Sequence, residues 1–212
     1  MPSPVKSPTA LVYALTSDVS NCLVTCLYLR SLQLPWYMPL PVKSPTALAD
    51  VLLRGYAGWN SRRAVQILDQ VFPKDAAVQP SLVIVYFGGN DSMRPHPDGL
   101  GPRVPLPEYI ENMRKIALHL KSLSAKTRII IISPPPDNEQ QIRETLGAYL
   151  NGSRTNEDCR IYSDACLKLC RELDVKAIDL WTAMQQRDDW LTACFTDGIH
   201  LSSEGSKEQD RS

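Results

Sequence analysis

Residues 80–92 read Pro-Ser-Leu-Val-Ile-Val-Tyr-Phe-Gly-Gly-Asn-Asp-Ser, and this stretch decides the fold class of the chain. The apolar run 82–87 shows no polar alternation, which is typical of a strand covered on both faces in a parallel sheet. Two glycines then allow the backbone to turn, so that Asn90 and Asp91 can lie at the carboxyl end of the strand, where open parallel sheets bind ligands. The stretch alone is equally compatible with an ordinary turn that these two residues merely form.

The same alternation continues along the chain on both sides of this strand. Further apolar strands are predicted at 49–53, 128–132 and 175–179, and amphipathic helices at 61–72, 108–123 and 157–173. Strands that alternate with helices predict right-handed crossovers and a parallel sheet with helices on both faces, which is an α/β fold. Two other segments read differently: the proline-rich loop 92–107 could line a pocket, and the polar segment 137–154 is expected to be a partly ordered excursion.

The first 48 residues are unlike the rest of the chain. They are rich in proline and have no sustained periodicity, and the octapeptide Pro-Val-Lys-Ser-Pro-Thr-Ala-Leu occurs identically at 4–11 and 41–48. Two copies are too few for a solenoid, so the repeat indicates a recent duplication or an error in assembling the sequence. We therefore expect an atypical segment at 1–48 and a folded domain at 49–212.

Composition narrows the class of partner. The chain has 212 residues and is 43% hydrophobic, and its 23 basic residues balance 23 acidic ones. The length suits one domain, and the balance of charge provides no field for nucleic acid or an anionic membrane, so a small neutral partner is expected. The apolar stretch 22–34 is interrupted by Arg30 and is too short to span a bilayer, which favours a cytoplasmic protein.

Six cysteines occur without any Cys-x-x-Cys pair, so we expect reduced thiols rather than a disulfide framework. Cys166 and Cys170 lie four residues apart on a predicted helix and could face one metal ion. Apart from Cys159, no further cysteine or histidine lies nearby at ligand spacing. No metal site is therefore predicted.

A pair of residues near the end of the chain has the spacing of an acid–base dyad. Asp197 and His200 are three residues apart across a glycine-containing turn, so the carboxylate can hold one imidazole nitrogen while the other faces a reaction partner. The competing interpretation is a helix-start carboxylate beside a surface histidine. Neither His96 nor His119 is assigned such a partner, and His119 is expected on a solvated helix face.

Three motifs in order then point to a family: Gly55-x-x-Gly58-x-Asn-Ser, Gly88-Gly-Asn-Asp91 and Asp197-Gly-Ile-His200. Together they resemble the SGNH, or GDSL, hydrolases. Within that family the chain is similar to the isoamyl acetate-hydrolysing esterase group in three longer stretches, which are Leu-Arg-Gly-Tyr-x-Gly-Trp-Asn-Ser-Arg, Tyr-Phe-Gly-Gly-Asn-Asp-Ser and Cys-Phe-Thr-Asp-Gly-Ile-His-Leu-Ser. The resemblance covers residues 49–207.

The resemblance implies a three-layer α/β/α fold with a parallel sheet, of the flavodoxin-like SGNH type. It also implies hydrolysis of small acyl or acetyl esters by a Ser-His-Asp mechanism that needs no cofactor. The Gly58 backbone N–H and the Asn90 side-chain amide would donate to the oxyanion, with His200 as general base and Asp197 as its orienting carboxylate. Asp91 and Ser92 are then expected to stabilise the turn. The oligomeric state is not implied.

The chain departs from the family pattern at both ends. The family nucleophile is the serine of a Gly-Asp-Ser motif after the first strand, and this sequence contains no such motif. Ser17 follows a possible strand at 11–15, but its context is Thr16-Ser17-Asp18, without the glycine. At the other end the chain stops after residues 205–212, where the family continues into a helix. The fold is thus expected to be incomplete at both ends, with the nucleophile unidentified.

Two further functions stay open on the sequence. A non-catalytic SGNH-fold remnant or splice form could retain the pocket around Gly58, Asn90 and His200 and bind a ligand without turnover. A flavodoxin-like nucleotide- or phosphate-binding domain would share the strand pattern. The sequence contains neither Gly-x-Gly-x-x-Gly nor the phosphate-loop motif, which argues against the latter.

Overall fold

A computed structural model describes residues 11–16, 50–96, 98–99, 101–150 and 152–206 of the chain. Its centre is a five-stranded, fully parallel sheet with the strand order β2-β1-β3-β4-β5. The strands are β1 (Leu11–Thr16), β2 (Asp50–Gly55), β3 (Leu82–Tyr86), β4 (Arg128–Ile132) and β5 (Lys176–Ile178). The predicted strands at 82–87, 128–132 and 175–179 are therefore confirmed to within a residue or two at their ends.

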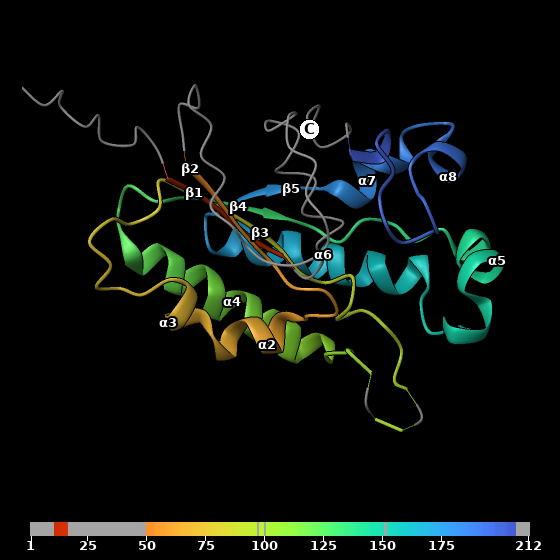
Figure 1. Cartoon of the computed structure of the whole chain (residues 1–212), viewed down its shortest axis with the longest axis horizontal. Helices are drawn as coiled ribbons and strands as arrows, with labels where there is room; N and C mark the ends of the chain where they lie inside the picture. The colour runs from red at the N-terminus through yellow and green to blue at the C-terminus, as the bar shows by residue number, and fades with distance from the viewer. Residues whose placement is uncertain (1–10, 17–49, 97, 100, 151, 207–212) are drawn as a thin grey trace, which may run out of the picture.

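Helices cover both faces of this sheet, as Figure 1 shows. One layer holds α2 (Ser61–Gln66), α3 (Leu68–Val71), α4 (Leu106–Leu123) and α6 (Asn156–Glu172), and the other holds α7 (Leu180–Gln185) and α8 (Trp190–Ala193). Successive side chains of a strand point to opposite faces. Val85 and Ile131 accordingly pack into the first layer, whereas Tyr86 and Ile132 pack against the second. The three-layer α/β/α prediction is correct.

The predicted helices form where their caps and apolar faces place them. The Asn60 side chain accepts a hydrogen bond from the Arg63 backbone N–H and caps α2. In α4, Tyr109, Met113 and Ile116 are fully buried at spacings of three and four residues. These helices fix the two loops that leave the carboxyl ends of β2 and β3.

The possible strand at 11–15 is present as β1, so the expectation that the fold is incomplete at its N-terminal end is wrong. β1 lies between β2 and β3 and pairs with both. It pairs with β2 from Leu11↔Asp50 to Thr16↔Gly55, and with β3 from Val12↔Leu82 to Thr16↔Tyr86. Part of segment 1–48 is thus integral to the sheet, because residues 11–16 supply the strand between β2 and β3. The domain boundary at residue 48 stays a prediction, and residues 207–212 lie outside the described part of the chain.

Most of the segment 137–154, which was expected to be a partly ordered excursion, forms a helix. It contains α5 (Glu139–Leu150), which Figure 1 places at the end of the molecule next to the start of α6. Ile142, Leu146 and Leu150 recur at four-residue spacing, and Ile142 is 3% exposed. This periodicity was the available signal for a helix, and the many polar residues between these positions obscured it.

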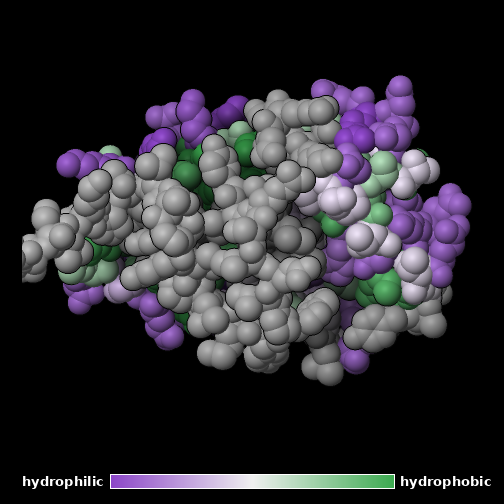
Figure 2. Space-filling model, turned by 45° about the horizontal axis from the view of Figure 1, so that its top comes forward, coloured by the Kyte–Doolittle hydropathy of each residue, from purple (hydrophilic) through white to green (hydrophobic). Residues whose placement is uncertain are grey.

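The described surface is mostly hydrophilic where Figure 2 shows it. The exposed large apolar side chains come from four different segments and are Val78, Leu118, Ile161 and Leu191. Isolated apolar residues of this kind are ordinary on a protein surface. Within the described ranges, no helix has the length and apolar content that crossing a bilayer requires.

Candidate active site

Asp197 holds His200 at two points. Its Oδ2 lies 2.5 Å from His200 Nδ1, while its Oδ1 accepts the backbone N–H groups of His200 at 2.9 Å and of Ile199 at 3.0 Å. Burial raises the pKa of Asp197, but these hydrogen bonds outweigh burial, so that the net pKa lies below its ordinary value. An ionised carboxylate therefore fixes the imidazole through Nδ1, and the base role falls to Nε2.

The turn that carries this dyad is clamped against the start of α5. Gly198 has φ of +94°, and a Cβ added there would come within 2.7 Å of the Asn138 carbonyl oxygen and of Ile142. The Gly198 carbonyl accepts the Asn138 N–H at 2.8 Å, and the Asp197 carbonyl accepts the Thr145 hydroxyl at 2.9 Å. Only glycine fits this position, which explains why the motif is Asp-Gly-Ile-His.

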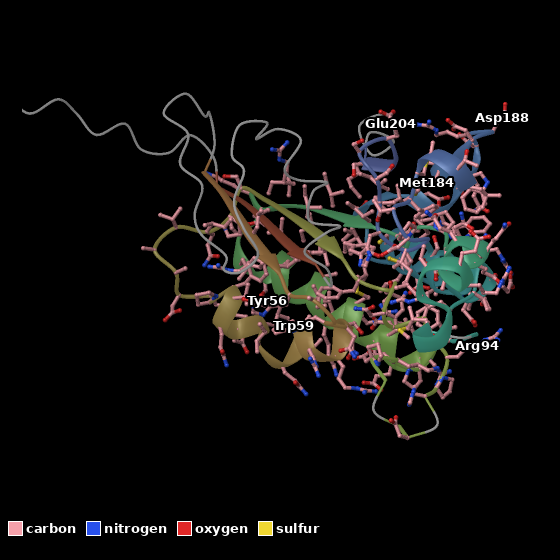
Figure 3. All side chains as sticks on the ribbon, turned by 45° about the vertical axis from the view of Figure 1, so that its right-hand side comes forward. Tyr56, Trp59, Arg94, Met184, Asp188 and Glu204 are labelled. Carbon is pink, nitrogen blue, oxygen red and sulfur yellow. The ribbon has the colours of Figure 1, made fainter. Side chains whose placement is uncertain are left out.

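The predicted oxyanion donors are joined by a direct hydrogen bond between their two turns. Gly58 follows β2 in a turn with φ of +74° and is exposed, and the neighbouring Trp59 stacks on Tyr56 with ring centroids 4.1 Å apart (Figure 3). The Asn90 Nδ2 group donates to the Trp59 carbonyl at 2.8 Å. The loops after β2 and β3 thus meet at the carboxyl edge of the sheet, as the topology requires.

Asp91 makes a second link between these loops. It is fully buried, and its Oδ1 accepts the Ser61 backbone N–H at 2.9 Å, at the first residue of α2. Asn112 of α4 in turn donates to the Ser61 hydroxyl at 3.1 Å. Burial raises the pKa of Asp91 to about 6, against the opposing effect of the hydrogen bonds from Ser61. The predicted turn-stabilising role of Asp91 is therefore supported by the structure.

Two buried charged residues that the sequence did not single out lie at the ends of the α5 segment. Arg154 donates to the Gly89 carbonyl at 2.7 Å and to the Asn90 Oδ1 at 2.6 Å, and Asp137 lies 4.0 Å from its guanidinium. Burial raises the pKa of Asp137 to about 6, although the Arg154 charge opposes the rise. The segment 137–154 therefore contacts the Asn90 turn through Arg154 and the His200 turn through Asn138. No motif in the sequence marked either residue, because both act through contacts distant in sequence.

The serines that the sequence offers as nucleophile candidates lie outside the described residues. The serines ahead of Gly55 are Ser3, Ser7, Ser17, Ser20, Ser31 and Ser44, and all lie outside the described ranges. The strand before Ser17 is described, however. β1 ends at Thr16, paired with Gly55 and Tyr86, between the two strands that lead to Gly58 and Asn90. Ser17 is thus the serine that directly follows β1 in the sequence.

The other two histidines are less suited to a base role. His96 pairs with Asp98, contrary to the expectation that it has no carboxylate partner, but both side chains are more than half exposed. His119 was expected without a carboxylate partner and on a solvated face; its Nδ1 instead lies 3.5 Å from Asp69 Oδ1, and it is 9% exposed, with Nε2 2.7 Å from the Phe72 carbonyl. The prediction of a solvated position for His119 is wrong because α3 and the residue after it, Phe72, cover this part of α4.

Known proteins are similar to this chain in sequence and in fold. Residues 35–207 match the model of the GDSL-like Lipase/Acylhydrolase family. The chain is 68% identical over 160 residues to the GDSL esterase/lipase WDL1 of Oryza sativa subsp. japonica, and 36% identical over 163 residues to the isoamyl acetate-hydrolyzing esterase 1 homolog of Rattus norvegicus. These matches cover 75% and 74% of this chain, but 62% and 64% of the relatives, so the chain spans less than two thirds of their length.

Solved structures support the same fold. The lipase/acylhydrolase of Enterococcus faecalis superposes with a TM-score of 0.63 at 14% identity, covering 93% of this chain and 90% of that one. Axe2, an acetylxylan esterase from Geobacillus stearothermophilus, gives a TM-score of 0.66 at 17% identity, with coverage of 95% and 91%. At such identities the similarity establishes the architecture alone. Together with the family model and the two relatives, it leads to one conclusion: the chain belongs to the GDSL-like lipase/acylhydrolase family.

Proposed function

We propose that this chain hydrolyses carboxylic esters with small acyl groups, using His200 as general base and Asp197 as its orienting carboxylate. The observation that carries the proposal is the two-point hold of Asp197 on His200, at 2.5 Å to Nδ1 and 2.9 Å to the backbone N–H. A surface histidine needs no such arrangement, whereas a general base gains a fixed tautomer and orientation from it. The curated relatives, whose names describe esterases, support the same class of reaction.

In the proposed mechanism, a serine oxygen attacks the ester carbonyl carbon while His200 Nε2 takes the hydroxyl proton. The resulting oxyanion accepts hydrogen bonds from the Gly58 N–H and the Asn90 Nδ2–H. His200 then returns the proton to the leaving alcohol as the ester C–O bond breaks, which leaves an acyl-serine. Water, deprotonated by His200, releases the carboxylic acid and regenerates the serine.

Ser17 is the nucleophile candidate that this proposal names first. It follows β1 in the sequence, and β1 lies between the strands that precede the two oxyanion donors. Its context, Thr16-Ser17-Asp18, lacks the glycine of the family motif. That departure favours a second candidate function, in which the chain keeps the pocket and binds an ester or a partner without turnover.

The test is hydrolysis of a short-chain chromogenic acetate by the purified chain, with His200→Ala and His96→Ala measured beside it. Removing the base from a serine hydrolase typically lowers the rate by about 10³-fold or more. We expect that loss in His200→Ala and an unchanged rate in His96→Ala, whose histidine lies in an exposed pair. Equal rates in all three proteins would refute the proposed base, and no turnover in the wild-type chain would support the binding function.

A further inference from the structure

Arg154 reaches the Asn90 turn from a distant part of the chain. Its Nη1 donates to the Gly89 carbonyl at 2.7 Å, and its Nη2 donates to the Asn90 Oδ1 at 2.6 Å. The side chain is 8% exposed. It is placed between the end of α5 and Thr155, whose hydroxyl accepts the Asp158 N–H and caps α6. The two helices therefore fix the origin of this side chain, and its forked end reaches residues 64 and 65 positions earlier in the sequence.

The contacts of this guanidinium are directed mainly at the turn rather than at a carboxylate. Asp137 is the partner of opposite charge, but it lies 4.0 Å away, beyond a hydrogen bond, and the Arg154 Nε atom has no hydrogen-bond partner among the described residues. Burying a cation is costly unless its donors are used. The two short hydrogen bonds that Arg154 donates to neutral oxygens are charge-assisted, which makes them stronger than ordinary amide hydrogen bonds.

These contacts determine which way the Asn90 amide faces. A guanidinium can only donate, so the amide oxygen must lie toward Arg154 and the NH₂ group away from it. One N–H of that group donates to the Trp59 carbonyl at 2.8 Å, and Nδ2 carries a second N–H that can serve the oxyanion. A flipped amide would place its oxygen against the Trp59 carbonyl and its NH₂ group against a cation. Both ends of the side chain therefore select the same orientation.

We propose that Arg154 is a positioning residue for the esterase reaction, which holds the Asn90 amide with an N–H directed at the developing oxyanion. The inference rests on the proposed function, because it assigns the amide its role there. A donor fixed before the reaction starts requires no reorganisation in the transition state, which is the source of oxyanion-hole catalysis. Arg154 acts through Asn90 and touches no substrate atom in this account.

The kinetic test is a double-mutant cycle between Arg154→Met and Asn90→Ala, with Arg160→Met as the matched control. Arg160 is an exposed arginine of α6 that pairs with Glu157 and Asp164. We expect Arg154→Met to lower kcat about 10- to 100-fold with little change in KM, and to have almost no further effect in the Asn90→Ala background. Arg154→Lys, which keeps the charge but not the fork, should fall between. Equal losses in both backgrounds would overturn the inference.

A second readout keeps the inference testable if the wild-type chain shows no turnover. The two side-chain amide protons of Asn90, identified in a ¹⁵N–¹H spectrum by their loss in Asn90→Ala, report its orientation directly. We expect a resolved, slowly exchanging pair in the wild type and in Arg160→Met, which moves toward the positions of free amides in Arg154→Met and Arg154→Lys. A pair that stays unchanged in the lysine variant, with its backbone spectrum intact, would overturn the positioning role. An inactive wild type with this shift would refute only the proposed function.

Discussion

Asp197 binds His200 through both carboxylate oxygens, Oδ2 to the ring Nδ1 and Oδ1 to the backbone N–H. The same carboxylate thus fixes the position of the residue and the direction of its ring. One carboxylate can do both because the two residues are only three apart, in a turn whose glycine packs against the start of α5. The dyad is therefore a local structure, and its substitution should affect the chemistry more than the fold.

Replacing Asp197 with asparagine should abolish most of the activity. The amide oxygen can still accept the backbone N–H groups, but a neutral amide cannot stabilise the imidazolium or secure the correct tautomer. Such a change costs about 10³ to 10⁴ in kcat in enzymes of this mechanism. The measurement is kcat on a short-chain ester, with Asp188→Asn as control, because Asp188 is exposed at the outer edge of the molecule in Figure 3. A loss of less than about tenfold would contradict the assigned role.

Two glycines of the α5 region make a matched pair for stability. In Gly198→Ala the new methyl group would lie 2.7 Å from Asn138 and Ile142, at a φ of +94°, so we expect a loss of about 2 to 4 kcal/mol in the free energy of unfolding. In Gly147→Ala nothing lies within 4 Å of the new group, and a helical alanine should add about 0.5 to 1 kcal/mol. Urea unfolding of both variants measures the difference, and equal stabilities would show that the turn is not clamped as described.

Asp91 should make the protein more stable in mild acid than at neutral pH. Its pKa is raised to about 6 in the folded chain, so the folded state holds a proton that the unfolded state has already lost. The contribution is fully present below the ordinary pKa near 3.8 and is lost as the pH rises through about 6. A pKa of about 6 in place of 3.8 corresponds to about 3 kcal/mol. Asp137 acts in the same direction, because its pKa is also raised to about 6.

Asp91→Asn isolates this effect. Asparagine keeps an oxygen that can accept the Ser61 N–H but does not ionise, so the free energy of unfolding of the variant relative to the wild type should increase between about pH 4 and pH 6. Urea titrations at four or five pH values measure this difference. A relative stability that is constant across the range, or that decreases, would mean that Asp91 ionises in the folded protein as easily as in the unfolded chain.

Asn90→Ala should lower kcat by about 10² to 10³, since one oxyanion donor contributes about 3 to 4 kcal/mol to transition-state stabilisation. KM for a small ester should change little, because the amide acts on charge that the substrate does not yet carry. Steady-state kinetics on a series of acyl lengths separates the two parameters. A rise in KM with kcat unchanged would instead identify Asn90 as a substrate-binding residue.

The sequence predicted the parts of the site that local pattern determines. Asp197 and His200 lie within one turn, so their contact follows from local sequence, whereas the role of Asn90 was implied by the family resemblance. Arg154 was not predictable in this way, because its contact with Asn90 joins positions 64 residues apart and depends on how α5 and α6 are placed. The strand at Leu11–Thr16 was visible in the sequence as a possible strand at 11–15. Its place in the sheet was not predicted, because it depends on pairing with β2 and β3, which no local signal encodes.

Covalent labelling would show whether a serine of this chain reacts under the control of His200. The purified chain would be treated with a serine-directed phosphonate and mapped by mass spectrometry, beside His200→Ala and Ser17→Ala. We expect one phosphonyl group per chain, lost in His200→Ala, with Ser17 as the first candidate for the labelled residue. If no serine is labelled under conditions that label an established serine esterase, the proposed esterase mechanism is wrong.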